Sequence, residues 1–389
     1  MDVALCYESV LPARGGCETY IADLARRLVA DAHEVHLYAS RWDGSTLPAA
    51  LHYHPLPRVD GPRFLRPWRF SAACLHALRR DSSQVSIGFN KTWGQDVLYP
   101  QAGLHVAAVE HNLCKYRHPL VRAAARCIKS LEPAHWSFCM LERRQYLGPK
   151  QSLVVVNSRM VREHFQRYYA IDPETVRIVH SAIDPARFQE DDRPRRRLEW
   201  RRRWGIGPEE TVALFVAMNY HLKGLDPLLE AVRRLPAGPP FRLLVVGNPH
   251  TREYKRKARC LGIADRVCFA GYYSDTRNCY FASDFLVHPT FYDPCSLVVL
   301  EALACGLPVI TSRHNGASEL LNPPHEGFVI DDPHDAGHLA WCLGQLLDAP
   351  RRQACTQAVR RKALEWTFDK HYRQFLGVLA EAAARKQAA

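Results

Sequence analysis

Two carboxylates eight positions apart flank the start of a predicted helix in the second half of the chain. Asp293 stands in a loop that follows an apolar run, and Glu301 lies on the second turn of the helix that we expect to begin near Ser296. The first amides of a helix have no partner within it, and its dipole is positive there, so this end can hold a diphosphate without a metal ion. One carboxylate can then meet sugar hydroxyls while the other reaches a ribose diol.

The same segment carries a family resemblance. Residues 293–309 read as an acid, seven residues and then Glu-Ala-Leu-Ala-x-Gly-Leu-Pro-Val, which resembles the donor signature of glycosyltransferase family 4. The resemblance implies that Glu301 holds the ribose and that Asp293, where the family usually has Glu, faces the transferred sugar. It also assigns to the donor site the residues between them, namely Pro294, Cys295, Ser296, Leu297 and Val298.

A pair of glycines lies between the first predicted strand and the first predicted helix. Gly15 and Gly16 can let the backbone approach a ligand closely at a helix N-terminus, or they can simply make a tight turn. With Glu18 they resemble the GG-x-E loop of the family. The resemblance places both glycines at the donor site, close to where an acceptor would bind.

A lysine follows the first predicted strand of the second half. Lys223 can neutralise the charge that builds on a leaving diphosphate, although a surface lysine is the structural alternative. Family members usually carry an Arg about one turn upstream, where this chain has Met218 and Asn219. We assign Asn219 to the donor site. Without the upstream Arg, the group of cations that binds the diphosphate is one short or is completed from elsewhere in the chain.

Three more candidate residues come after predicted strands. His105 resembles the histidine that many relatives place beside the sugar, and we interpret it as catalytic. Gly247 and Tyr272 lie where the family receives the base of the donor. A packed or solvent-facing histidine and ordinary turn residues are the alternatives.

Short apolar runs alternate with polar helical stretches along the whole chain, which is typical of βα units and parallel sheets. We expect strands at 3–7, 34–39, 85–89, 153–156, 212–216, 243–247, 267–271, 285–288 and 308–310, and helices at 17–30 and 225–234. Because single cores stop growing near ~250–300 residues, 389 residues predict two domains.

The fold class that follows is α/β, with two Rossmann-like doubly wound domains that face each other across a cleft, the GT-B architecture. We place an acceptor domain at 1–182 and a nucleotide-sugar domain at 183–366, and we expect a last helix at 367–389 to pack back on the first domain. The arginine-rich block at 193–204 is interpreted as the solvated face of a helix near the junction.

The net charge of +12 calls for an anionic partner, such as nucleic acid, phospholipid or a phosphorylated glycan. Residues 87–97 resemble the Gly-Phe-Asn-Lys segment of glucosyltransferases that build the lipopolysaccharide inner core. That resemblance implies UDP-glucose as donor, a heptose-bearing lipid core as acceptor, and no nucleic acid. It also implies peripheral contact of 115–146 with an anionic inner membrane from the cytoplasmic side, although an ordinary helical excursion would explain this run equally well.

The expected reaction is retaining hexosyl transfer without a cofactor or a metal. No Asp-x-Asp follows a strand, and no P-loop is present. The 13 cysteines show no CxxC pair and no zinc-type spacing. With the absence of a leader, this cysteine pattern also indicates a reducing, cytoplasmic setting. Alternatives are a glycogen- or trehalose-type synthase, a GDP-mannose-dependent mannosyltransferase, a nucleotide-sugar epimerase of the same fold, and a non-catalytic protein that binds membranes or RNA.

Overall fold

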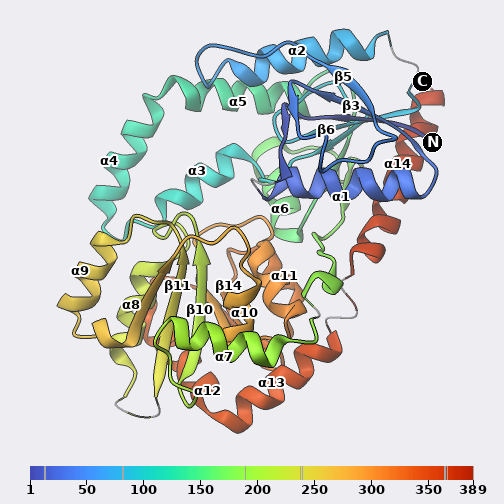
Figure 1. Ribbon diagram of the computed structural model, residues 1–389. Helices are drawn as coiled ribbons and strands as arrows, with labels where there is room; N and C mark the ends of the chain where they lie inside the picture. Colours follow the sequence, from blue (N-terminus) through green and yellow to red (C-terminus); the bar gives the residue numbers. More distant parts are fainter. Residues whose placement is uncertain are drawn as a thin grey trace. The chain divides into compact units, whose positions relative to one another are not determined.

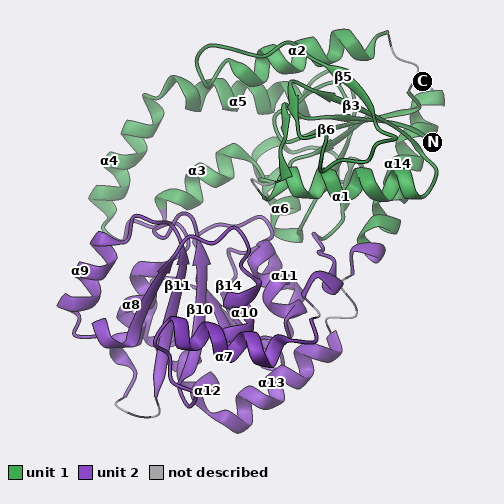
Figure 2. Ribbon diagram, in the orientation of Figure 1, with its two compact units in different colours: residues 1–113, 118–180, 371–389 green, residues 114–117, 181–370 purple. Residues whose placement is uncertain are grey.

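The chain folds into two compact α/β units, described here from a computed structural model. Unit 1 comprises residues 1–113, 118–180 and 371–389, and unit 2 comprises 114–117 and 181–370 (Figure 2). The structure describes residues 1–12, 15–80, 83–188, 190–236, 238, 240–362, 365 and 367–388.

Unit 1 is built on a seven-stranded parallel sheet with the order β5-β3-β1-β6-β7-β8-β9 (Figure 1). Its strands are β1 (Asp2–Cys6), β3 (Glu34–Ala39), β5 (His52–Pro55), β6 (Val85–Phe89), β7 (Val97–Tyr99), β8 (Leu153–Val156) and β9 (Val176–Ile178). Two short strands, β2 (Ser9–Val10) and β4 (Arg41–Trp42), pair in parallel and form a separate small sheet. The strand order reverses between β1 and β6, which is where doubly wound sheets bind ligands.

Seven helices of unit 1 connect or cover these strands. They are α1 (Cys17–Ala30), α2 (Arg66–Leu78), α3 (His105–Leu113), α4 (Pro119–Ser130), α5 (Pro133–Tyr146), α6 (Arg159–Tyr169) and α14 (Phe368–Ala388). One core cluster joins Cys6 and Tyr38 of the sheet to Phe70 and Cys74 of α2. A short 3-10 turn, η2 (Pro173–Thr175), precedes β9.

The last helix, α14, is tied to unit 1 by polar and aromatic contacts. The imidazole of His371 lies 2.7 Å from the hydroxyl of Tyr20 and 2.7 Å from the carbonyl of His180. Arg177 donates two hydrogen bonds to the carboxylate of Glu381, at 2.7 and 3.0 Å. The C-terminal residues from His371 onward therefore belong to the first unit, although 190 residues of unit 2 separate them from it in sequence.

Unit 2 has a six-stranded parallel sheet with the order β12-β11-β10-β13-β14-β15. Its strands are β10 (Thr211–Ala217), β11 (Phe241–Gly247), β12 (Val267–Gly271), β13 (Phe285–His288), β14 (Val309–Ser312) and β15 (Gly327–Ile330). Alternate residues of β10 enter two different core clusters, with Phe215 in one and Leu214 in the other. Helices therefore cover both faces of this sheet, as the doubly wound expectation requires.

The helices of unit 2 divide between these two clusters. They are α7 (Arg193–Arg203), α8 (Leu225–Arg234), α9 (Arg252–Cys260), α10 (Arg277–Ala282), α11 (Leu297–Ala304), α12 (Ala336–Leu347) and α13 (Ala349–Lys362), with 3-10 turns η3 (Pro185–Phe188), η4 (Ala264–Arg266) and η5 (Gly316–Leu320). Residues of α8 and α12 pack in one cluster, and residues of α10 and α11 pack in the other.

The arginine-rich helix α7 differs from the sequence interpretation. Arg201 is only 3% exposed, and its guanidinium lies 2.8 Å from Asp284 Oδ2, while Arg197 lies 2.6 Å from Asp284 Oδ1. A solvated face was therefore the wrong interpretation for these two residues. Asp284 also accepts the N–H of Val212, so α7 is fastened to the beginning of β10 and β13 by a shared carboxylate.

The strands and the two helices named from the sequence are all present, to within one or two residues at their ends. Strands β5, β9 and β15 were not predicted, because each has only three or four residues and carries polar side chains or a glycine. Among the helices that the structure describes, none combines the length and apolar character that crossing a bilayer requires.

Candidate functional site

Two of the predicted site residues, Lys223 and Asp293, come together at the switch point of the unit 2 sheet. Strand order reverses between β10 and β13, and these two strands pair directly. The loop after β10 carries Lys223, and the loop after β13 carries Asp293. Carboxyl ends of parallel strands meet at one edge of a sheet, so residues 70 positions apart come together there.

Lys223 and Asp293 form a direct ion pair. Lys223 Nζ lies 2.6 Å from Asp293 Oδ2 and donates a second hydrogen bond, at 3.0 Å, to the carbonyl of Tyr292. The adjacent Gly224 has φ of 82°, and a Cβ there would lie 2.1 Å from the carbonyl oxygen of Pro289. Only glycine allows the two loops to approach this closely, so Gly224 sets the position of the lysine.

The pair sits in a partly desolvated, charge-balanced environment. Burial alone would raise the pKa of Asp293, but the nearby Lys223 ammonium holds it well below its usual range. His288 Nε2 lies 3.9 Å from the same carboxylate oxygen, and burial lowers the pKa of this imidazole. Neither ring nitrogen of His288 has a hydrogen-bond partner among the described residues. His288 is a residue that the sequence analysis did not single out, although it ends the strand before Asp293.

Helix α11 begins after Ser296, as predicted. Two of the backbone N–H groups at its N-terminus have no acceptor among the described residues and can bind a ligand. The N–H of Ser296 donates to Asn315 Oδ1 at 3.1 Å, and Asn315 is itself held by the hydroxyl of Thr311 at 3.0 Å. No atom of the described residues accepts a hydrogen bond from the N–H of Leu297 or Val298. These two amides are therefore the ones that can bind an anion.

Glu301 lies one turn further along α11 and has a single well-defined partner. The hydroxyl of Tyr280 donates to Glu301 Oε2 at 2.5 Å. Burial raises the pKa of Glu301 to about 7, and the hydrogen bond from Tyr280 and the charge of Arg187 oppose that rise. The second carboxylate oxygen can accept hydroxyl donors from a ligand, and Arg187 is a nearby cation that the sequence analysis did not identify.

The remaining donor candidates divide into supporting and exposed residues. Gly247 has φ of 120°, and a Cβ there would lie 2.1 Å from the carbonyl oxygen of Ala217, so strand pairing by itself requires this glycine. Cys295 is buried, Tyr272 is exposed, and Pro294 is half-buried. Asn219 is exposed, and its side chain accepts the N–H of Leu222 at 3.1 Å, which braces the loop that carries Lys223.

In unit 1 the paired glycines stand at the start of α1. Gly15 and Gly16 have φ of 76° and 60°, and a Cβ at either would meet nothing within 4 Å. The positive φ values explain the residue type, and the open space leaves room for a ligand. Glu18 accepts the N–H of Leu11 at 2.7 Å and so fixes the loop. The preceding Ala13 and Arg14 lie outside the described residues.

His105 is the first residue of α3 and is embedded among side chains of α5. Its N–H donates to the buried carboxylate of Glu142, and its Nε2 lies 3.1 Å from His135 Nδ1. The ring also packs edge-on against Phe138. Burial, with Lys91 and His135 as further causes, lowers the pKa of His105 to about 3. The imidazole is accordingly neutral.

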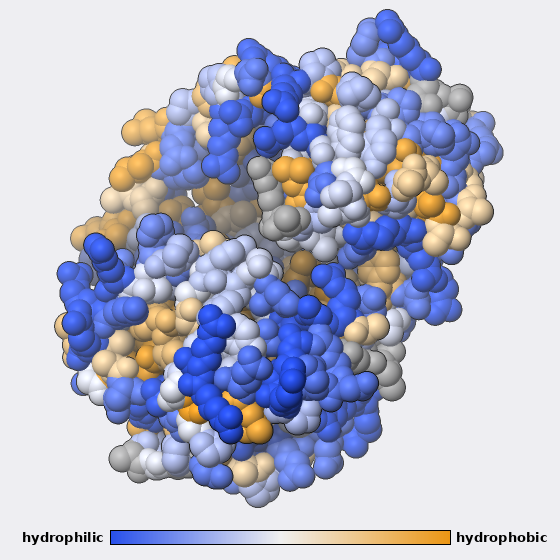
Figure 3. Space-filling view, in the orientation of Figure 1, coloured by the Kyte–Doolittle hydropathy of each residue, from blue (hydrophilic) through white to orange (hydrophobic). Residues whose placement is uncertain are grey.

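Helix α4 exposes an apolar and basic surface within the predicted membrane-contacting run. None of its residues is buried, and Figure 3 shows hydrophobic side chains over α4 and the start of α5. Exposed apolar residues there are Leu120, Val121, Ile128, Leu131, Trp136 and Met140. Such a group of large exposed side chains marks an interaction surface.

A hollow in unit 1 lies between α3, α4 and α5. It has a volume of about 360 Å³, and three cations line it, Arg126, Lys129 and Arg167. His135 and Glu110 also contribute to its wall. A basic hollow of this kind fits a phosphorylated or carboxylated ligand.

Comparisons with known proteins show which family the chain belongs to. Residues 14–187 match the sequence family described as Glycosyltransferase Family 4, and residues 196–362 match Glycosyl transferases group 1. The chain is 26% identical over 367 residues to the lipopolysaccharide glucosyltransferase WaaG of Escherichia coli, an alignment that covers 93% of this chain and 94% of the relative. It is 27% identical over 412 residues to a D-inositol 3-phosphate glycosyltransferase of Acidothermus cellulolyticus, covering 96% and 87%.

Solved structures show the same fold. The crystal structure of WaaG matches with a TM-score of 0.77 at 24% identity, covering 97% of this chain and 99% of that one. Anabaena HepE in complex with UDP-glucose matches with a TM-score of 0.68 at 20% identity, covering 97% and 99%.

A probable transglycosylase of Burkholderia thailandensis is 30% identical over 381 residues, which covers 96% of this chain and 95% of the relative. The chain therefore belongs to glycosyltransferase family 4 and is a glycosyltransferase of GT-B fold.

Proposed function

We propose that this glycosyltransferase moves a hexose from a nucleotide diphosphate sugar to a lipid-linked glycan, with retention of configuration and without a metal ion. UDP-glucose is the first candidate donor, and the heptose of a lipopolysaccharide core is the first candidate acceptor. Support comes from the similarity to a lipopolysaccharide glucosyltransferase and to a protein solved with UDP-glucose.

The arrangement at the switch point of unit 2 carries the proposal. Two unpaired helix amides, at Leu297 and Val298, lie on the same short segment as Glu301, and the Lys223–Asp293 pair comes just before it. Amides and a lysine suit a diphosphate, and a carboxylate with a free oxygen suits a ribose diol. These groups match the three parts of a nucleotide sugar.

Each step of the transfer has a residue of this chain to support it. The bond between the sugar anomeric carbon and the diphosphate oxygen breaks, and the acceptor hydroxyl oxygen bonds to that carbon from the same face. The hydroxyl proton goes to the leaving phosphate oxygen. Lys223 and the amides of Leu297 and Val298 stabilise the charge on the diphosphate as it forms. Asp293 accepts hydrogen bonds from sugar hydroxyls once Lys223 turns toward phosphate.

Unit 1 supplies the acceptor site in this proposal. His105 and the open loop at Gly15 and Gly16 follow strands of its sheet, and the basic hollow beside His135 suits the phosphates of a core glycolipid. The relative named for D-inositol 3-phosphate favours a second acceptor class, a small phosphorylated polyol. A panel of acceptors, with heptose-bearing lipid core and inositol phosphate as its two arms, separates these classes.

Replacing Glu301 with Ala should abolish detectable binding of UDP-glucose, because the ribose loses its carboxylate partner. The measurement is isothermal titration calorimetry, with circular dichroism to show that the fold persists. Glu199→Ala, on the exposed side of α7, is the matched control and should bind as the unmodified protein does. Unchanged affinity in Glu301→Ala would contradict the donor site.

The same titration with other donors tests the rest of the assignment. GDP-mannose binding in place of UDP-glucose would make the protein a mannosyltransferase. Hydrolysis or isomerisation of UDP-glucose with no acceptor present would instead indicate an epimerase of the same fold.

A further inference from the structure

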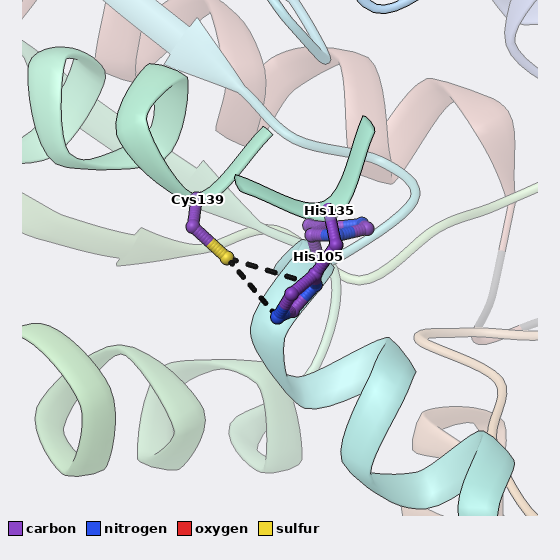
Figure 4. A group of neighbouring side chains, drawn as sticks. All are labelled: His105, His135 and Cys139. Atoms are coloured by element: carbon purple, nitrogen blue, oxygen red, sulfur yellow. Dashed lines mark hydrogen bonds between the residues drawn. The ribbon is translucent and has the colours of Figure 1, made fainter. Parts of the chain in front are cut away.

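Three metal-ligand side chains converge in unit 1, at a place where the sequence analysis expected no metal. Figure 4 shows His105, from the start of α3, together with His135 and Cys139 of α5. His105 Nε2 lies 3.1 Å from His135 Nδ1, and Cys139 Sγ lies 3.8 Å from that same nitrogen. One ligand atom from each residue can be chosen so that all three lie within 4.8 Å of one another.

The separation of the two histidine nitrogens is close to one edge of a zinc tetrahedron. Bond lengths of about 2.05 Å to nitrogen and about 2.3 Å to sulfur put two nitrogens about 3.3 Å apart and a nitrogen and a sulfur about 3.6 Å apart. The observed 3.1 Å between His105 Nε2 and His135 Nδ1 is close to the first of these values. Cys139 Sγ lies 3.8 Å from Nδ1 and 3.9 Å from Nε2 of His135, so the imidazole or the thiol must turn for one nitrogen and the sulfur to bind the same ion. We propose that His105, His135 and Cys139 form a zinc site whose fourth position is open to water or another small ligand.

The local fold holds the ligands in place. His135 and Cys139 are four positions apart on α5, so they project from the same side of the helix. The buried carboxylate of Glu142, one turn later on the same helix, accepts the N–H groups of His105 and Val106 and thereby fastens the start of α3 against α5. This is the kind of surrounding support that keeps metal ligands oriented.

An ion can reach the site through the hollow of unit 1, past the side chains of Arg126, Lys129 and Arg167. His135 lines the hollow of about 360 Å³ described above, which provides access from outside. Lys91 and Lys129 act on the two imidazoles, while Glu132 and Glu142 act on His135 and Cys139 with the opposite sign. Arg143 also acts on Cys139, so three cations and two carboxylates surround the three ligands, and the ligand atoms themselves must supply the attraction for a divalent ion.

The set of donor atoms favours zinc over magnesium or calcium. Imidazole nitrogens and a thiolate bind zinc and other soft or borderline ions, whereas magnesium and calcium prefer oxygen. A second group of potential ligands in the described residues, Asp2, Glu34 and His36, is dominated by oxygen. It is therefore the appropriate comparison for a zinc-selective site.

Bound zinc would block the enzyme. His105 is the residue that the proposed function places beside the sugar, so this consequence rests on that function. A metal on Nε2 removes the imidazole from its hydrogen-bonding role and places a cation where a neutral ring stands. We therefore expect zinc to inhibit transfer, while the reaction itself proceeds in excess chelator.

Cobalt binding tests the site without reference to activity. Chelator-treated, reduced full-length protein is titrated with Co²⁺, and the expected result is one equivalent bound, with visible bands of a tetrahedral ion and a near-ultraviolet thiolate charge-transfer band that Zn²⁺ abolishes. Cys139→Ser should lose the thiolate band. His135→Asn should weaken metal binding by at least about tenfold, because even the loss of a group that only supports a ligand lowers metal affinity by about that factor.

Two matched variants serve as controls. Cys127→Ser removes an exposed cysteine from the neighbouring helix α4, and His36→Asn removes the imidazole of the oxygen-rich group. Both should keep the thiolate band and the affinity for Zn²⁺. A band that persists in Cys139→Ser, or that is absent from the unmodified protein, would overturn the site.

Transfer assays with and without Zn²⁺ test the inhibition separately. The unmodified enzyme should be inhibited by Zn²⁺ and fully restored by chelator, and Cys139→Ser should resist the metal. A thiolate band in a protein without transferase activity would leave the zinc site standing and overturn the proposed function. Zinc binding without inhibition would overturn the inhibitory role and the placement of His105 at the sugar.

Discussion

At the scale of single residues, the candidate donor site keeps two carboxylates in different states. Asp293 has Lys223 at 2.6 Å, which holds its pKa low, whereas burial raises the pKa of Glu301 to about 7 despite the Tyr280 hydroxyl and the charge of Arg187. Asp293 is therefore ionised at neutral pH and Glu301 is poised near its midpoint. The two acids differ in environment rather than in type, and this difference suits them to different parts of a donor.

Replacing Lys223 with Met should lower kcat by about 100- to 1000-fold, the usual effect of losing one donor to a developing oxyanion. The measurement is steady-state transfer from UDP-glucose. Lys257→Met, which removes a half-buried lysine paired with Asp226 of α8, is the control and should leave kcat unchanged. A similar small effect in both variants would show that Lys223 is a structural partner of Asp293 only.

Replacing Glu301 with Gln should stabilise the ligand-free protein at alkaline pH. The pKa of this carboxyl is about 7 in the folded chain, against the ordinary value of 4.5, so between these values the folded state holds a proton that the unfolded state has released. Stability therefore falls as pH rises through this window and stays lower above it. Gln keeps an acceptor for Tyr280 and has no charge to bury.

The melting temperature, measured from about pH 5 to about pH 8, checks this expectation. The variant should lose less stability than the unmodified protein over this range and should melt at a higher temperature at the alkaline end. Parallel pH profiles for the two proteins would show that Glu301 carries no such penalty. UDP-glucose should stabilise only the unmodified protein, because the ionised carboxylate is the form that binds a ribose.

At the scale of elements, helix starts and helix faces carry the function. The start of α11 leaves two amides for an anion, whereas the start of α3 has its amides taken by Glu142. The same local feature thus serves a ligand in one unit and internal support in the other. Helix α4 differs from both, since none of its side chains is buried and large apolar residues lie beside Arg122 and Arg126.

Replacing Ile128 with Glu should weaken binding to anionic phospholipid vesicles by about tenfold or more, because it removes apolar contact and adds a repelled charge. Co-sedimentation with vesicles of phosphatidylglycerol measures this, and raising the salt concentration should weaken binding as well. Leu198→Glu changes another exposed apolar residue, on α7, and is the control. Equal binding by both variants would remove α4 from the membrane proposal.

At the scale of the whole molecule, the chain contains two parallel sheets, each with its own reversal of strand order. In unit 2 the reversal gathers the loops that carry Lys223 and Asp293, while in unit 1 the candidates Gly15, Gly16 and His105 follow different strands. The chain completes the first unit only with its final helix, since residues from His371 belong to unit 1. Unit 1 therefore cannot be complete until the last part of the chain is available.

The sequence alone determined the longer strands, the helices at 17–30 and 225–234, the last helix and the family, because apolar periodicity, glycine turns and the spacing of Asp293 and Glu301 are local properties of the chain. It did not reveal that Lys223 and Asp293 would pair, or that His105, His135 and Cys139 would meet. His105 and His135 are 30 positions apart, and Lys223 and Asp293 are 70 positions apart. Only sheet order and helix packing bring such residues together, so the tertiary structure decided them.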